Sequence, residues 1–287
     1  MNKSQKIKNP LIISTGIYRL ANEKEPNYVN NILEFYADHE ALVDIIDGVE
    51  LNIRTPEIME TLILSDKSTN FLQSLNHNTL HYFYFSFFTF NQDNQLSPKD
   101  FEYIDKLKSI NDKIHFRSVV IHPFPYNEKE VLMLYKIFHD KLDIPVFNFE
   151  SMLRDIDINN TDFERLFVDE NIGLLLDASH AVAAHTSNSL YTFEYLKPFF
   201  DRISYLHISS TRRDLAYYDN TGFFCPSKGH SMFIETNSED LILFDKVFEF
   251  IENKPFLGLI LEQCIKEKDI GPLIKEIHFI KKHFLQI

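Results

Sequence analysis

The chain of 287 residues is poor in the features that mark secreted and membrane proteins. Only two cysteines are present, Cys225 and Cys264, so no disulfide framework is available and a reducing cytoplasm is the expected location. No apolar run approaches the length needed to span a bilayer. The short apolar run after the basic segment 1–8 is better explained as a first strand than as a signal peptide.

Linker-like composition is also absent. The seven glycines and eleven prolines are scattered, and neither a low-complexity segment nor an internal repeat divides the chain into halves. A chain of this size can bury the core of one α/β barrel or of two ordinary domains. We therefore expect a single domain over residues 1–287, with two packed α/β domains as the alternative.

Positive charge is scarce: the chain has 29 Lys and Arg residues but 42 Asp and Glu residues, which gives a formal net charge of -13. A protein of this sign repels polyanions at long range, so nucleic acid is a disfavoured partner unless a local basic patch overrides the total. Bound divalent cations would offset part of the charge near a site.

The chain does contain a regular alternation of apolar runs and helical segments. Residues 172–176 are apolar apart from Gly173, as expected of a strand buried on both faces, and polar residues begin at Asp177. Seven further runs have this character: 11–15, 48–53, 79–85, 117–122, 145–150, 203–210 and 257–262. Helical segments lie between them, among them 28–46, 98–110, 128–139, 190–200 and 240–251. Eight strands that alternate with helices predict a single (β/α)8 TIM barrel.

Six of these strands stop at or beside a residue that can bind a metal. The residues are His81, His122, Glu150, Asp177, His207 and Glu262. The carboxyl ends of all strands of a parallel barrel meet at one rim, so these groups would surround one mouth. His180, three residues after Asp177, and His230, in the aperiodic segment 211–237, are expected to join them, and Glu50 is a further candidate for the rim.

Each residue alone has an ordinary structural explanation. A histidine at a strand end is more often a core or surface residue than a ligand, and a carboxylate there is more often a helix cap. Gathered at one mouth, however, unpartnered carboxylates and imidazoles are costly, and divalent cations are the simplest compensation. Imidazoles and carboxylates without a thiolate suit Zn, Mn, Fe or Co better than Ca. We therefore predict that the chain binds divalent ions at this mouth.

The strand-end motifs resemble those of the xylose-isomerase-like barrels. The motifs are Ile121-His122-Pro123, Phe149-Glu150, Leu176-Asp177-Ala-Ser-His180-Ala, Leu206-His207-Ile and Leu261-Glu262. This superfamily includes endonuclease IV, the ketose 3-epimerases and the inositol-catabolism isomerases. The resemblance runs from the third strand to the eighth, and Asp-x-x-His-Ala after a buried strand is its most specific part.

The resemblance to the epimerases implies one catalytic metal. Its ligands would be Glu150, Asp177, His207 and Glu262. Glu150 and Glu262 would remove and return a proton beside the carbonyl of a sugar, while His180 and Arg213 contact the substrate. A metal-dependent isomerase or epimerase that acts on a small sugar or sugar phosphate through an enediolate is the function that the sequence favours. This function leaves His81 and His122 unexplained.

The resemblance to endonuclease IV implies a multinuclear zinc phosphodiesterase instead. His81, His122 and Glu150 would hold a first ion, Glu150 would bridge to a second ion held with Asp177, His207 and Glu262, and His180 with His230 would hold a third. The last loop departs from the family pattern, because Lys228-Gly229-His230 replaces Asp-x-His and the Gly-x-Gly expected after it is missing. Lys228 would contribute a positive charge there instead.

Two further hypotheses rank lower. One is a multinuclear iron oxidase that modifies a peptide, which is a more distant resemblance because Asp-x-x-His stands here in place of that group's Asp-x-x-Asn. The other is a barrel that binds a ligand without chemistry. The sequence leaves the substrate, the native metal, the number of ions and the oligomeric state open, a homo-oligomer included.

Overall fold

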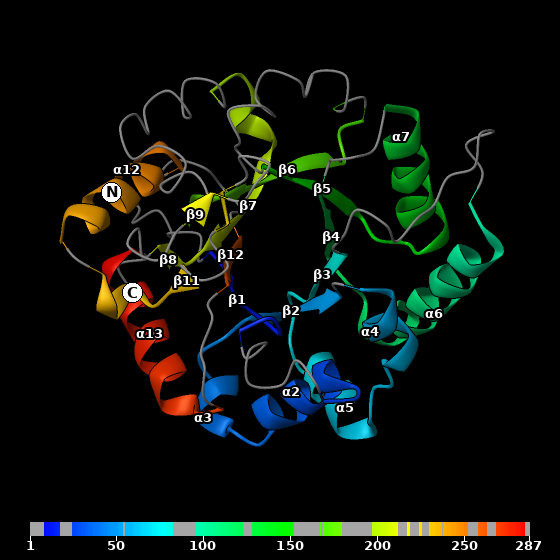
Figure 1. Ribbon diagram of the computed structural model, residues 1–287, viewed down its shortest axis with the longest axis horizontal. Coiled ribbons are helices and arrows are strands. Elements are labelled where there is room, and N and C mark those ends of the chain that lie inside the picture. Colours follow the sequence, from blue (N-terminus) through cyan, green and yellow to red (C-terminus); the bar gives the residue numbers. More distant parts are fainter. Residues whose placement is uncertain are drawn as a thin grey trace, which may run out of the picture.

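The architecture is a closed barrel of eight parallel strands, shown by the computed structural model in Figure 1. The strands are β1 (Leu11–Ser14), β2 (Gly48–Ile53), β3 (Thr79–Tyr82), β4 (Ser118–Ile121), β5 (Val146–Ser151), β6 (Ile172–Asp177), β7 (Ile203–Ile208) and β12 (Gly258–Leu261). The last barrel strand pairs with the first, Ile260 opposite Ile12, which closes the sheet. The predicted (β/α)8 barrel is confirmed.

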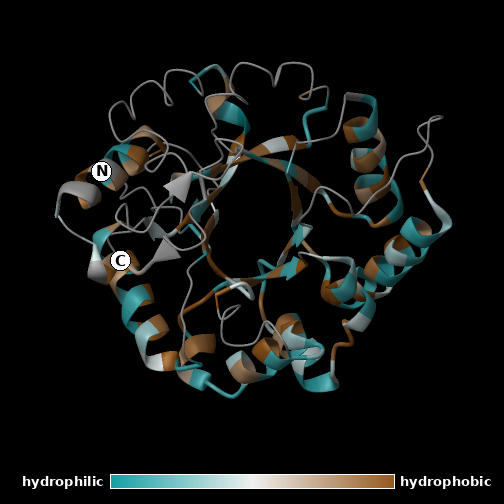
Figure 2. Ribbon diagram, viewed as in Figure 1, coloured by the Kyte–Doolittle hydropathy of each residue, from teal (hydrophilic) through white to brown (hydrophobic). Residues whose placement is uncertain are grey.

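The structure describes residues 9–17, 25–53, 55–82, 96–122, 128–151, 167, 169–179, 197–211, 217–218, 224–225, 230–236, 238–251, 258–262 and 268–284. Helices ring the barrel on its outside, with their apolar faces turned toward the strands (Figure 2). They are α2 (Tyr28–Ala37), α3 (Glu40–Val43), α4 (Pro56–Thr61), α5 (Asp66–Gln73), α6 (Pro98–Ile114), α7 (Glu128–Lys136), α12 (Ser238–Ile251) and α13 (Ile270–His283). Short turns of other helix types are η1 (Ile137–Lys141), η2 (Lys197–Arg202) and η4 (Phe233–Glu235). Within the described ranges, no helix combines the length and the apolarity that a membrane crossing requires.

Local sequence signals explain the starts of α4, α5, α6 and α13, each of which has a side-chain N-cap. Ser97 begins α6 with a capping box, since its side chain accepts from the Asp100 amide and Asp100 accepts from the Ser97 amide, and Pro98 occupies the first turn. The predicted helix 28–46 is instead two helices. His39 lies between them with φ -118° and ψ 86°, outside the helical region, while its ring nitrogen Nδ1 lies 2.6 Å from the Phe35 carbonyl.

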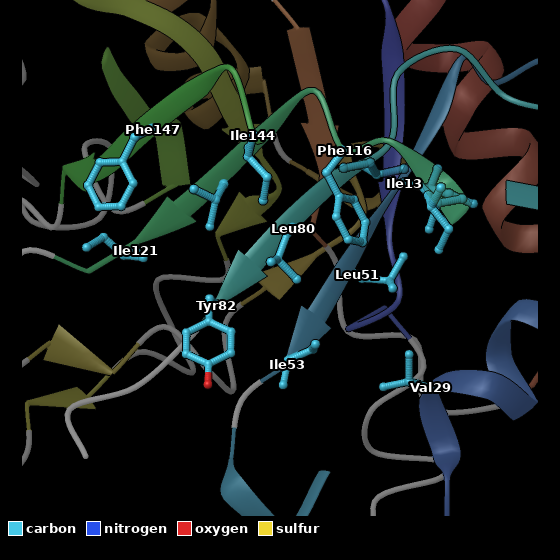
Figure 3. Close-up of a cluster of buried hydrophobic side chains, with 14 of the residues drawn as sticks. Ile13, Val29, Leu51, Ile53, Leu80, Tyr82, Phe116, Ile121, Ile144 and Phe147 are labelled. Carbon is cyan, nitrogen blue, oxygen red and sulfur yellow. The ribbon is translucent and has the colours of Figure 1, made fainter. Parts of the chain in front are cut away.

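The two faces of the barrel strands carry different side chains. Outward residues pack against the helices in one continuous core, part of which is drawn in Figure 3, where Leu51 and Ile53 of β2 lie beside Leu80 and Tyr82 of β3. Inward residues form a separate small apolar layer of Ile12, Val120, Leu175 and Ile260. Because side chains alternate along a strand, residues two positions farther on also face the interior, and these are the polar rim residues.

Two short strand pairs follow β7. Ser210–Thr211 (β8) pairs antiparallel with His230–Ser231 (β11), and Tyr217–Tyr218 (β9) pairs with Phe224–Cys225 (β10). After β11, the buried carboxylate of Glu276 in α13 accepts hydrogen bonds from the Phe233 and Ile234 amides. The segment 230–236 is therefore anchored both to the end of β7 and to the last helix.

Candidate metal centre

Seven ionisable side chains from seven of the eight strands meet inside the carboxyl end of the barrel. They are Glu50, His81, His122, Glu150, Asp177, His207 and Glu262. All are nearly enclosed, from 0% exposed for Glu50 to 9% for Glu262. Strand alternation explains three of these positions: His122, Asp177 and Glu262 each lie two residues after a member of the apolar layer, namely Val120, Leu175 and Ile260.

The first group consists of His81, His122 and Glu150. Oε2 of Glu150 lies 2.8 Å from Nε2 of His122 and 3.1 Å from Nε2 of His81, and the two Nε2 atoms are 3.3 Å apart. Although it is buried, this oxygen makes no well-oriented hydrogen bond within the described part of the chain. Three ligand atoms that converge on one point are typical of a metal site, because tetrahedral bonds of about 2.0–2.1 Å separate ligand atoms by about 3.3 Å.

The second group consists of Glu150, Asp177, His207 and Glu262, each with one ligand atom within 4.8 Å of the others. Nδ1 of His207 lies 3.5 Å from Oε1 of Glu150 and 3.5 Å from Oε2 of Glu262. The Ser179 hydroxyl donates to Oδ1 of Asp177 at 2.6 Å and orients that carboxylate. Glu150 thus presents Oε2 to the first group and Oε1 to the second, so the two groups share it.

Glu50 joins the cluster from β2. Its Oε2 lies 3.0 Å from Nε2 of His207, and its Oε1 lies 3.6 Å from Nδ1 of His81. The sequence marked Glu50 as a candidate for the rim but did not count it among the ligands. A stronger signal was available, since Glu50 and Asn52 alternate with Val49, Leu51 and Ile53 in β2, which places a charge on the interior face.

Two carboxylates of the cluster, Glu50 and Glu150, have pKa values below the usual range. Burial by itself would raise the pKa of Glu50, but the neighbouring His207 and His81 outweigh it and lower that pKa to about 2. The pKa of Glu150 is well below its usual value for the same reason, because His122 and His207 outweigh the effect of burial.

The pKa values of His81 and His207 shift in the opposite direction. Burial by itself would lower the pKa of His81, but Glu50 and Glu150 raise it to about 9. The pKa of His207 lies well above its usual value, because Glu50, Glu150 and Glu262 outweigh burial. Without a cation, the raised pKa values favour the protonated forms of His81 and His207 beside the carboxylates.

The charge balance and the donor types fit divalent metal. Four carboxylates and three imidazoles are buried together, so one negative charge remains even if every imidazole is protonated, and four remain if none is. Buried uncompensated charge is unfavourable by several kcal/mol per ion. Two divalent cations would balance four carboxylates and neutral imidazoles, with nitrogen and oxygen donors that suit Zn, Mn, Fe or Co.

The other predicted site residues are placed only in part. His180, Arg213 and Lys228 lie outside the described residues. His230 is described through its backbone, which pairs with Thr211 four residues after His207. The structure thus brings six of the predicted ligands together. It also returns the chain at His230 toward the same end of β7. The remaining assignments stay predictions.

Comparison with solved structures gives matches along nearly the whole chain. Endonuclease IV from Thermus thermophilus matches with a TM-score of 0.57 and 12% identity, over 96% of this chain and 98% of that one. A D-tagatose 3-epimerase-like protein matches with a TM-score of 0.58 and 17% identity, over 96% of this chain and 97% of that one. The IOLI protein, solved with a zinc atom, matches with a TM-score of 0.54 and 14% identity, over 95% of both chains.

No family model matches the sequence, and no curated protein matches it significantly. The structural matches have identities of 17% or less, so they show the fold alone. The proteins matched include an endonuclease and an epimerase-like protein, which were the two kinds of protein named from the strand-end motifs. The prediction is therefore confirmed at the level of fold: the chain is a (β/α)8 barrel, and its fold is similar to that of these proteins.

Proposed function

We propose that the protein is a divalent-metal-dependent hydrolase that holds two ions side by side in the barrel mouth and cleaves a phosphate ester of a small molecule. The observation that carries the proposal is the convergence of Nε2 of His81 and Nε2 of His122 on Oε2 of Glu150. A single-ion site does not need these two histidines, whereas a second ion next to the first does.

Glu150 is the residue that would join the two positions. One of its oxygens faces the His81 and His122 nitrogens, and the other faces Nδ1 of His207. A carboxylate with one oxygen toward each position would let both ions act on the same substrate, as in two-metal hydrolytic sites. Asp177, His207 and Glu262 would complete the second position.

When bound, two adjacent divalent ions would provide an activated water and would offset the negative charge of a phosphate. The chain's own contribution is enclosure and orientation. Glu262 is the most exposed member of the set at 9%, and it would be the carboxylate that accepts a proton from water. The net charge of -13 favours a small phosphorylated substrate over a nucleic acid.

A sugar isomerase or epimerase is the second candidate. The observation that favours it is that Glu150, Asp177, His207 and Glu262 form a complete ligand group by themselves. Glu150 and Glu262 would then move a proton between two positions of a sugar, with Arg213 and His180 as substrate contacts. An iron oxidase that modifies a peptide and a non-catalytic binding barrel stay lower-ranked predictions.

The two candidates differ in what they require of His122. We would purify the protein without chelator, count ions per chain by elemental analysis, and assay phosphomonoesters, phosphodiesters, abasic-site DNA, ketoses and ketose phosphates with Zn, Mn, Fe or Co. The hydrolase predicts two ions per chain, with His122→Ala reducing the count to one and removing hydrolysis. The isomerase predicts one ion, and ketose conversion that survives His122→Ala.

The control is Asp100→Asn, which neutralises a buried carboxylate outside the barrel at the start of α6. It should leave both the ion count and the activity unchanged. Ketose conversion by a one-ion protein, without ester hydrolysis, would reject the hydrolase in favour of the isomerase. Cleavage of abasic-site DNA alone would keep the hydrolase but replace the small substrate with nucleic acid.

A further inference from the structure

Glu50 stands behind the two proposed metal positions, on the far side of the histidine rings. Nδ1 of His207 faces Glu150 and Glu262, whereas its Nε2 faces Glu50 at 3.0 Å. Nε2 of His81 faces Glu150, whereas its Nδ1 faces Glu50 at 3.6 Å. One carboxylate therefore contacts the outer nitrogen of one histidine from each metal position.

Oε2 of Glu50 lies within hydrogen-bonding distance of Nε2 of His207, and a carboxylate oxygen accepts, so the proton belongs on Nε2. Oε1 lies 3.6 Å from Nδ1 of His81, just beyond hydrogen-bonding distance, and the nearby carboxylate favours a proton on that nitrogen. In a neutral imidazole, the proton on one nitrogen leaves the lone pair on the other. A proton on Nε2 of His207 leaves the lone pair on Nδ1, toward Glu150 and Glu262. A proton on Nδ1 of His81 leaves the lone pair on Nε2, toward Glu150 and His122.

We infer that Glu50 is a positioning residue that sets the tautomers and the orientations of His81 and His207, and thereby prepares both metal positions at once. This inference rests on the proposed two-ion centre. A carboxylate that accepts the outer N–H of a ligating histidine typically contributes a factor of 10 to 100 to metal affinity. Here a single residue would serve two ions.

The location of Glu50 supports this role over that of a direct ligand. It is 0% exposed, and its backbone is held in the closed sheet, with its carbonyl accepting from the Thr15 amide at 2.9 Å. A third ion among Glu50, His81 and His207 is the competing explanation, because their atoms also lie within 4.8 Å of one another. That arrangement would require both rings to lose their last proton and bridge two ions each.

Glu50→Gln tests the inference, because an amide of the same size has one acceptor and one donor end. The amide oxygen is expected to keep the 3.0 Å contact with His207, which turns the NH2 group toward Nδ1 of His81. The His81 proton then moves to Nε2, the atom required by the first ion. We expect the affinity of the first ion to fall by about 10- to 100-fold and that of the second to fall less.

The measurement is a cobalt titration of the metal-free protein, followed by its visible absorption bands and by elemental analysis, with Asp100→Asn as the buried-carboxylate control. A tenfold fall at either position in Glu50→Gln alone supports the role of Glu50. If both metal affinities of Glu50→Gln stay within twofold of the parent's, the proposed role of Glu50 is overturned. The same holds if the metal affinities fall equally in Asp100→Asn. A parent with three ions, of which Glu50→Gln loses only the third, also overturns it.

A second measurement needs no variant. Nitrogen NMR of the histidine rings in the zinc-loaded parent should show the proton of His207 on Nε2 and that of His81 on Nδ1. The opposite tautomer at both rings would reject the inference even if Glu50→Gln failed to fold. A parent that binds no ion would reject the proposed function itself, whereas two ions with unchanged Glu50→Gln affinities would reject only the role of Glu50.

Discussion

Strand β5 shows two regions of the molecule on its two faces. Phe147 and Phe149 point outward into the layer between barrel and helices, where their rings meet edge to face at 5.3 Å. Asn148 and Glu150 point inward, where Glu150 lies among imidazoles. The outer face stabilises the fold by roughly 25 cal/mol per Å² of buried apolar area, while the inner face is unfavourable unless cations or protons compensate it. Residues that stabilise the fold and residues of the candidate site therefore alternate along the same strand.

The largest effect is expected on the outer face. Phe147→Ala removes a ring that packs against Tyr135, Phe138 and Phe149, and it should reduce the free energy of unfolding by about 3–5 kcal/mol. Chemical denaturation of the metal-free protein measures this loss. The ion count of the folded fraction should stay the same. A parallel loss of metal affinity would show that the two faces are coupled.

On the inner face, Asp177→Ala should abolish tight binding at the second metal position while the metal-free protein unfolds much as the parent does. Removal of a direct ligand should exceed the 10- to 100-fold loss typical of a supporting residue. Calorimetric titration and thermal unfolding of the same sample separate the two quantities. Unchanged metal content in this variant would contradict the site.

Removing the ions and adding them back should change the free energy of unfolding of the whole barrel, although the ions would contact only the inner face of the strands. Zinc, manganese or cobalt added to chelator-treated protein at a hundred times its dissociation constant should stabilise the fold by about 2.7 kcal/mol for one ion. Differential scanning calorimetry at several ion concentrations would measure this gain. An equal gain in Asp177→Ala would place the ion elsewhere.

The smallest effect is expected at a helix start outside the barrel. Ser97→Ala removes the side chain that caps α6 and should reduce the free energy of unfolding by about 1 kcal/mol. Urea denaturation measures that change, and metal titration should give the parent's affinities. A change in metal affinity would mean that α6 affects the rim through the strands beside it.

The sequence predicted the barrel, and which residues gather at its rim, for one physical reason. A strand buried on both faces is a continuous apolar run, so its end is visible where a charge or an imidazole first appears, as at His122, Asp177 and Glu262. Ser97 and Pro98 likewise marked the start of α6 locally. The break at His39 was not predicted, because the segment 28–46 keeps a helical pattern through it. The cytoplasmic location and the single domain stay predictions.

By itself, the sequence determined which residues reach the rim, because side-chain alternation and strand length are local properties of the chain. Only the tertiary structure decided which of them touch. Glu50 and His207 are 157 residues apart, and closure of the sheet brings β2 and β7 to one interior where their side chains meet at 3.0 Å. The division of the cluster into two groups that share Glu150 depends on distances of a few ångströms across the barrel, which the strand patterns do not contain.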